Sequence, residues 1–368
     1  MADTRSVSQL TPELWDEDFS TEYFQTNPMA AYAGTSSNNP IVMKEDLASR
    51  RASGISYEFI RRLTPGAKLD RAPLKGYEQR LGEYGDKVTW NVRKEAISIH
   101  EMDTDLAAIN LREASRSALK DWADEDVKFQ TIINLMSVGT LSNLLYDASL
   151  ATIGGTGTVA TAADRNAWDL ANPDRILYAR AVNRTLGNHG ASLANITAGQ
   201  TLNRAAVGGL KRLAAIANPK VTPIKVTEKN KRVYVLFVHP FTMRDIRADL
   251  ETARQNVSVV EQNNGIFLGG DVEYDGVLIH EVDDMPLINN GTINVAPAFL
   301  VGQEAIGWGI KSRFRTREDE DDYGQVMGIG MIGKWGMKKL VWNFGTADAS
   351  IIGRQRGVVS AFFPAVAD

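Results

Sequence analysis

The sequence predicts an α+β fold on three observations. The near-continuous apolar run from Val233 to Val238 is typical of a strand buried on both faces, and further strands and helices alternate around it within residues 200–345. A long amphipathic stripe upstream predicts a single helix over residues 110–138. Residues 55–103 alternate between apolar and polar positions, as the strands of a hairpin do. The chain of 368 residues is long enough for two to three subdomains with cores of their own.

The predicted helix has a clear start. Asn110 and Glu113 stand at the N-cap and N3 positions of a capping box, and Gly139 is a plausible stop. At 1.5 Å per residue the helix would be roughly 40 Å long. Its charged outer face, which includes Lys128, is either solvated or part of a subunit interface. The apolar stripe, with members at helical steps, consists of Leu111, Ser115, Ala118, Trp122, Phe129, Ile133 and Met136.

Residues 1–54 are typical of an arm because their apolar residues are scattered among dense polar ones. Trp15, Phe19 and Tyr23 are the exception, since their spacing of four fits one face of a short helix. Aromatic side chains on such an arm need a surface to cover them. Both the body of the same chain and another subunit remain open as that surface.

Composition excludes several classes of protein. The net charge of −4 argues against a protein that wraps DNA with its whole surface, because such surfaces are basic. The absence of cysteine excludes disulfides, thiolate zinc sites and cysteine nucleophiles. We see no signal peptide, and no stretch reaches the roughly 18 apolar residues of a membrane span, so we expect no membrane partner.

Chemical motifs are weak throughout. Gly328–Gly333 matches G-x-G-x-x-G, but a strand follows where a dinucleotide site needs a helix, so a glycine-rich turn or strand is the better interpretation. The carboxylates between His280 and Asp284 could bind a divalent cation, although a solvated strand end is simpler. Neither a P-loop nor a G-x-S-x-G elbow is present. We therefore expect no catalytic, cofactor or metal-binding residues, and no enzyme.

Charge patterning predicts assembly surfaces instead. Three arginines alternate just before an acidic block, and on a strand they would project from one face. Such blocks could meet complementary blocks on a neighbouring subunit; the alternative is a loop with screened surface charge. The predicted interface residues are Trp15, Phe19, Tyr23, Arg61, Arg62, Trp90, Arg313, Arg315, Arg317, Asp319, Asp321 and Asp322.

Five short stretches, in order and at a consistent spacing, carry a resemblance that spans residues from about 85 to 345. They are Asn110-Leu111-Arg112-Glu113-Ala114 running to Leu119-Lys120-Asp121-Trp122, then Tyr234-Val235-Leu236-Phe237-Val238-His239-Pro240, Tyr274-Asp275-Gly276-Val277, Leu300-Val301-Gly302-Gln303-Glu304-Ala305 and Asp322-Tyr323-Gly324. With them the chain resembles the major capsid proteins of phage N4 and its podovirus relatives, which have the Hong Kong 97-type capsid fold.

The resemblance implies the domain organisation of that fold. It comprises an arm, a β-hairpin called the E-loop, a peripheral (P) domain with a long spine helix, and an axial (A) domain of α/β character. The corresponding residues are 1–54 for the arm, 55–103 for the E-loop, 104–199 for the P domain with its spine helix at 110–138, 200–345 for mainly the A domain with strands returning to the P domain, and 346–368 for a C-terminal segment.

The resemblance also implies a function. The chain would be the major capsid protein of a tailed bacteriophage, assembling with itself into hexamers and pentamers of an icosahedral shell around double-stranded DNA. Scaffolding, decoration and portal proteins would be further partners, and the DNA would touch the inner face without sequence specificity. The protein would reside in the virion capsid after assembly in the bacterial cytoplasm, with no cofactor. The alternative is a soluble α/β protein that binds a small ligand or nucleotide through residues 200–345.

Overall fold

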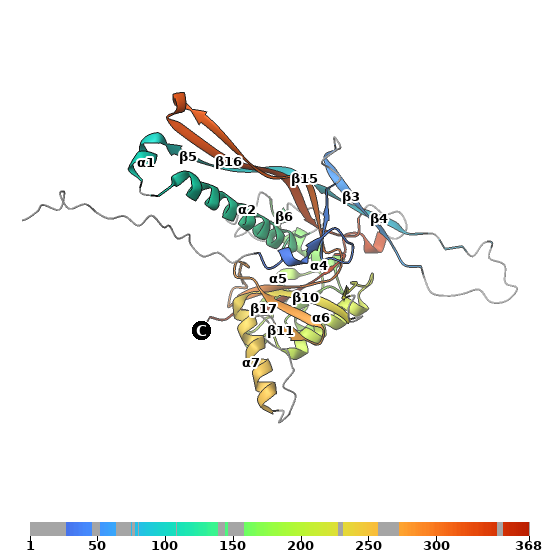
Figure 1. Cartoon of the computed structure of the whole chain (residues 1–368). Coiled ribbons are helices and arrows are strands. Elements are labelled where there is room, and N and C mark those ends of the chain that lie inside the picture. The colour runs from blue at the N-terminus through green and yellow to red at the C-terminus, as the bar shows by residue number, and fades with distance from the viewer. Residues whose placement is uncertain are drawn as a thin grey trace, which may run out of the picture.

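The computed structural model describes residues 27–45, 52–63, 75, 78–79, 81–107, 109–138, 144–145, 158–226, 231–256, 272–343 and 349–367. Two sheets organise this part of the chain, one of five strands and one of eight, and two small two-stranded sheets accompany them. Figure 1 shows a long, thin upper layer, formed by the five-stranded sheet and helix α2, above a more compact lower layer. Among the described residues, no helix is long and apolar enough to cross a membrane.

The upper layer is built on an antiparallel ribbon. Strand β15 (Ile306–Asp321) pairs with β16 (Val326–Lys339) from end to end, with two register shifts, and β5 (Asn91–His100) adds to the far side of β16. Strand β2 (Ile41–Lys44) joins β15 in parallel, and β1 (Ala33–Gly34) completes the sheet. The short helix α1 (Glu101–Leu106) follows β5 at the distal end.

Helix α2 (Leu111–Leu135) lies along this sheet, as the sequence predicted. The side chain of Asn110 caps it by accepting a hydrogen bond from the backbone N–H of Glu113 at 3.3 Å. Leu119 is fully buried against the sheet, and Trp122 packs edge-to-face on Phe314 with ring centroids 5.7 Å apart.

Two details of the predicted helix face are wrong. Ala118 is exposed, because Leu119, one position on, faces the sheet. Lys128, assigned to the charged outer face, is buried because it forms an ion pair with Asp284 from the lower layer.

The lower layer contains the eight-stranded sheet, and most of the core residues surround it. Its central strand β10 (Lys231–Val238) is buried from Val233 onward on both faces, as its apolar run predicted. The strand order is β11-β12-β10-β14-β17-β8, with β9 and β13 attached to β10 and β14. The bounds are β8 Ile176–Tyr178, β9 Ile224–Val226, β11 Val272–Tyr274, β12 Val277–Glu281, β13 Ile288–Asn289, β14 Asn294–Val301 and β17 Val358–Pro364; the helices are α4 Ala162–Ala171, α5 His189–Ala194, α6 Arg204–Ile216 and α7 Pro240–Asn256.

The predicted segments 104–199 and 346–368 both contribute strands to the lower layer. Within the first, β8 pairs with β17. Within the second, β17 is fully buried between β14 and β8. A strand of three residues, or one paired with distant partners, leaves little local pattern in a sequence, so neither pairing was predicted.

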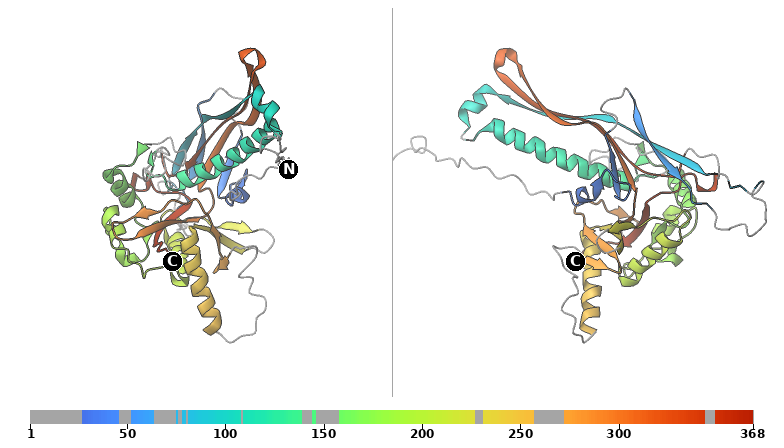
Figure 2. Two further views of the ribbon diagram at one scale, coloured as in Figure 1. Left: turned by 90° about the vertical axis from the view of Figure 1, so that its left-hand side faces the viewer. Right: turned by 45° about the vertical axis from the view of Figure 1, so that its right-hand side comes forward.

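The hairpin is shorter than residues 55–103. It consists of β3 (Gly54–Ile60) paired with β4 (Glu83–Thr89), and the chain then passes through Trp90 into β5 of the five-stranded sheet. Alternation continues across Trp90, so the sequence pattern did not reveal the change of sheet. Figure 2 shows the hairpin and the β15–β16 ribbon extending on opposite sides of the molecule.

The apolar face of the hairpin base is covered by its own chain. Its five core residues pack against Leu340, Trp342 and Ile351, with Phe59 and Tyr84 both edge-to-face on the Trp342 ring. A neighbouring subunit is therefore not needed to cover the base. The five residues are Ile55, Tyr57, Phe59, Tyr84 and Val88.

Candidate assembly surfaces

The ribbon segment with three arginines and five acids is partly neutralised within the chain. Arg313 forms an ion pair with Glu45 at 2.6 Å. Glu318 receives hydrogen bonds from Arg116 and Arg112 of α2, and these bonds lower the pKa of its carboxyl group. Arg313 and Glu318 therefore already have partners of opposite charge in their own chain.

The remaining predicted residues of the ribbon are free for contacts between subunits. A register shift between Ser312 and Arg315 interrupts the alternation that would have put all three arginines in line. Within the part of the chain that the structure describes, none of the following exposed side chains forms an ion pair: Arg315, Arg317, Asp319, Asp321 and Asp322.

The distal end of the upper layer combines acidic and apolar side chains. Tyr323, at the turn of the ribbon, is completely exposed and has a φ of 57°. Met102 and Leu106 of α1 are also largely exposed, and the backbone N–H of Glu101 donates to the carbonyl of Gln325 at 2.8 Å, which joins α1 to the ribbon turn. Exposed apolar groups of this size are typical of surfaces that meet a partner.

The hairpin side chains divide into two groups. Trp90 is held by its own chain, since its Nε1 donates to the carbonyl of Ala52 at 2.8 Å and Lys311 lies 4.5 Å from its ring centroid. Beyond the covered base, Ile60 is 64% and Leu63 is 52% exposed. Arg62 is exposed beside them. This outer part of the hairpin therefore presents apolar and basic groups to solvent.

A pocket of about 900 Å³ lies between the outer hairpin and the end of α6. Two of its basic residues, Arg61 and Arg62, were predicted as interface residues from the sequence; the others were not, because they come from distant segments. The buried side chains of Tyr234 and Trp342 are among its lining residues. One acidic residue, Glu304, lines the pocket. Six basic residues line it as well: Arg61, Arg62, Lys211, Lys220, Arg232 and Arg356.

Buried polar contacts join the two layers. Lys339 of β16 is fully buried, and its Nζ donates to the backbone carbonyls of Leu135 and Ser137 at the end of α2. Burial lowers the pKa of Lys339 to about 7, because no water solvates the charged form. The ammonium also lies 5.7 Å from the ring centroid of Trp168 in the lower layer.

The candidate cation site between residues 280 and 284 is occupied by protein contacts. The Tyr32 hydroxyl and Nε2 of His280 are hydrogen-bonded, Glu281 pairs with Arg247 at 3.4 Å, and Asp284 pairs with Lys128. In the described residues no group of three or more histidines and carboxylates could hold a metal ion.

The G-x-G-x-x-G stretch lies inside strand β16, which agrees with its interpretation as a glycine-rich strand. A Cβ on Gly333 would come within 2.8 Å of the Phe314 ring, so this glycine is needed for close packing. The predicted arm residues Trp15, Phe19 and Tyr23 lie outside the described residues.

Comparison with known proteins gives a consistent result. A family model described as phage capsid protein matches residues 3–360. No curated protein matches the sequence.

Solved structures match over the whole chain. The capsid asymmetric unit of cyanophage Pam1 is 26% identical with a TM-score of 0.82, and the match covers 100% of both chains. The capsid of Ralstonia phage GP4 is 18% identical with a TM-score of 0.73, covering 99% of each chain. The capsid of Helicobacter pylori bacteriophage KHP30 is 11% identical with a TM-score of 0.69, covering 97% of this chain and 96% of that one. The last two show likeness of fold.

Proposed function

This chain belongs to the phage capsid protein family and is a major capsid protein of a bacteriophage, and on that premise we propose how it forms a shell. The observation that carries the function is the family match over residues 3–360, together with a fold shared along the whole chain. The protein is a structural subunit of an icosahedral capsid, with mixed α/β content. The alternative of a nucleotide-binding protein is not supported, since its candidate loop is a strand.

The five-stranded layer with α2 serves as the P domain in this proposal, and the eight-stranded layer serves as the A domain. The P domain then consists of segments from residues 27–45, 91–138 and 306–339, and the A domain of residues 158–303 and 349–367. We place the chain with the N4-like podoviruses on the five stretches of sequence that carry that resemblance.

The outer hairpin is the proposed E-loop contact. Its base is fixed by the cluster around Trp342, while Ile60, Leu63 and Leu81 remain 46–64% exposed. A two-stranded hairpin gains little stability from its own pairing in water, so these side chains need a covering surface. We assign that surface to the P domain of a neighbouring subunit in the same capsomer.

Other partners follow from this role. Copies of the chain form hexamers and pentamers, and scaffolding, decoration and portal proteins bind the resulting shell. Double-stranded DNA lies against the inner face without sequence specificity, in keeping with a net charge of −4. Assembly takes place in the cytoplasm of the bacterial host, and no catalytic step is required.

The test is a deletion that removes the hairpin tip and keeps the covered base. Residues 60–82, which include Ile60, Leu63 and Leu81, are replaced by a short Gly-Ser turn, which leaves Phe59 and Tyr84 of the covered base in place. The expected product is a folded subunit with an unchanged circular dichroism spectrum that forms no closed shells by electron microscopy. Closed shells of normal size from this variant would disprove the E-loop contact.

A further inference from the structure

The basic pocket beside the hairpin has more positive charge than its own chain neutralises. Glu304, its one acid, is paired with Arg356. Arg62, Lys220 and Arg232 are exposed, and no carboxylate among the described residues forms an ion pair with them. Cations gathered around a concave surface attract an anionic partner, because their potentials add within it.

The pocket is also partly apolar. Ile216, at the end of α6, is 72% exposed, and Ile60 and Leu63 border the opposite side. A free phosphate or another small anion would leave these side chains uncovered. The fitting partner is therefore a polypeptide segment that carries several carboxylates and large apolar side chains.

The chain contains one segment with this chemistry outside the described residues, at residues 11–24. No lysine or arginine occurs between Arg5 and Lys44, so the acids of this stretch have no basic neighbour along the chain. The acidic ribbon turn is a weaker match, because Glu318 is already paired and Tyr323 is its one aromatic residue. The relevant residues of the segment are Glu13, Asp16, Glu17, Asp18 and Glu22 with Trp15, Phe19, Tyr23 and Phe24.

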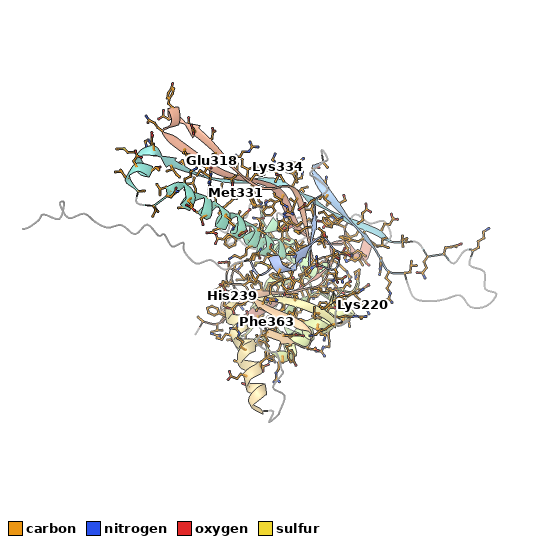
Figure 3. The ribbon with its side chains drawn as sticks, in the orientation of Figure 1. Lys220, His239, Glu318, Met331, Lys334 and Phe363 are labelled. Carbon is orange, nitrogen blue, oxygen red and sulfur yellow. The ribbon has the colours of Figure 1, made fainter. Side chains whose placement is uncertain are left out.

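The position of the chain that follows residues 11–24 favours supply of the segment by a neighbouring copy. Tyr32, which follows this segment in the chain, contacts Phe237 and His280 at the carboxyl ends of β10 and β12. The pocket instead includes Arg232 and Tyr234 at the amino end of β10. Figure 3 shows Lys220, at the pocket, and His239, just past the carboxyl end of β10, on opposite sides of the lower layer.

We propose that residues 11–24 of one copy occupy the basic pocket of the next copy in the capsomer. An arm that leaves one edge of the subunit and binds at the opposite edge of its neighbour makes a head-to-tail contact, the kind that closes a ring. The proposal rests on the proposed function, because it requires copies to lie side by side in a shell. In this arrangement the basic pocket of the neighbouring copy covers the aromatic side chains of the arm.

Cysteine crosslinking tests the proposal cleanly because the natural chain has no cysteine. One variant combines Ser20→Cys in the arm with Ala215→Cys, an exposed pocket residue on α6. The matched control combines Ser20→Cys with Ala118→Cys, which is exposed on α2 away from the pocket. Assembled particles are treated with a flexible bis-maleimide and separated on a denaturing gel.

The expected result is a ladder of covalent dimers up to hexamers for the pocket variant, with little crosslinking in the control. Adding Lys220→Glu and Arg232→Glu should lower the yield on the order of tenfold, because two favourable ion pairs become repulsive. Adding Lys94→Glu, a charge reversal at an exposed residue of β5, should leave the yield unchanged.

Each other outcome has a distinct meaning. Crosslinking confined to single chains would show that the arm binds its own pocket and would overturn the exchange between copies. Normal particles without pocket crosslinks would overturn the inference and leave the capsid function standing. Failure of the cysteine-free parent to form particles at all would count against the proposed function itself.

Discussion

Because Lys339 is buried, the stability of the subunit should increase with pH. The pKa of Lys339 falls from 10.5 in the unfolded chain to about 7 in the fold because the side chain is fully buried, and no carboxylate of the described residues pairs with it. Between these two values the unfolded chain binds the extra proton, so the free energy of unfolding rises as the pH rises. The slope is about 1.4 kcal/mol per pH unit, and the full effect is ~5 kcal/mol.

The perturbation is Lys339→Met, which removes the titrating group. Urea unfolding of the free subunit at about pH 7 and 9 measures the change. Relative to the variant, the natural chain should gain about 2 kcal/mol of stability over this range, because Lys339 is still partly charged near pH 7 in the fold. Lys120→Met, at an exposed residue of α2, should retain the pH slope of the natural chain.

The variant also loses two hydrogen bonds. The carbonyls of Leu135 and Ser137 would lack their donor, which costs about 1–3 kcal/mol at every pH and does not alter the slope. Parallel pH profiles for Lys339→Met and the natural chain would refute the reasoning, since they would show that the buried amine does not titrate in this range.

Three further predictions concern single contacts. Leu119→Ala should lower the free energy of unfolding, measured with urea, by about 2–5 kcal/mol, because it opens a cavity against β5 and β16. A loss below about 1 kcal/mol would show that Leu119 does not lie on the buried face of the helix. Asp86→Ala should cost about 3–5 kcal/mol, since it leaves the Lys338 ammonium buried without its ion pair, and a near-neutral thermal shift would contradict this. The double variant Arg315→Glu with Arg317→Glu should reduce particle yield at low salt while changing subunit stability by about 0–1 kcal/mol. If particle yield falls only as far as subunit stability falls, an interface role is excluded.

The sequence predicted those elements whose pattern is local. The capping box at Asn110 located the start of α2, and the apolar run of β10 marked a buried central strand. The alternation around Tyr57 and Val88 marked the hairpin. Each of these signals reflects burial or hydrogen bonding among residues close together in the chain.

Features that depend on distant segments could not be predicted. The burial of Lys128 requires Asp284, and the cover of the hairpin base requires Trp342. The basic pocket joins residues from the hairpin, α6, β10 and the C-terminal region, and no spacing in the sequence brings them together. Periodicity shows which face is buried; it does not show what buries it.

Electron microscopy of purified particles tests the central claim most directly. Subunits produced alone or with their phage partners should form closed icosahedral shells, in which the outer hairpin of each subunit lies on its neighbour and the eight-stranded layers surround the capsomer axes. A subunit that stays a compact monomer, with Ile60 and Leu63 still exposed under all assembly conditions, would contradict the account.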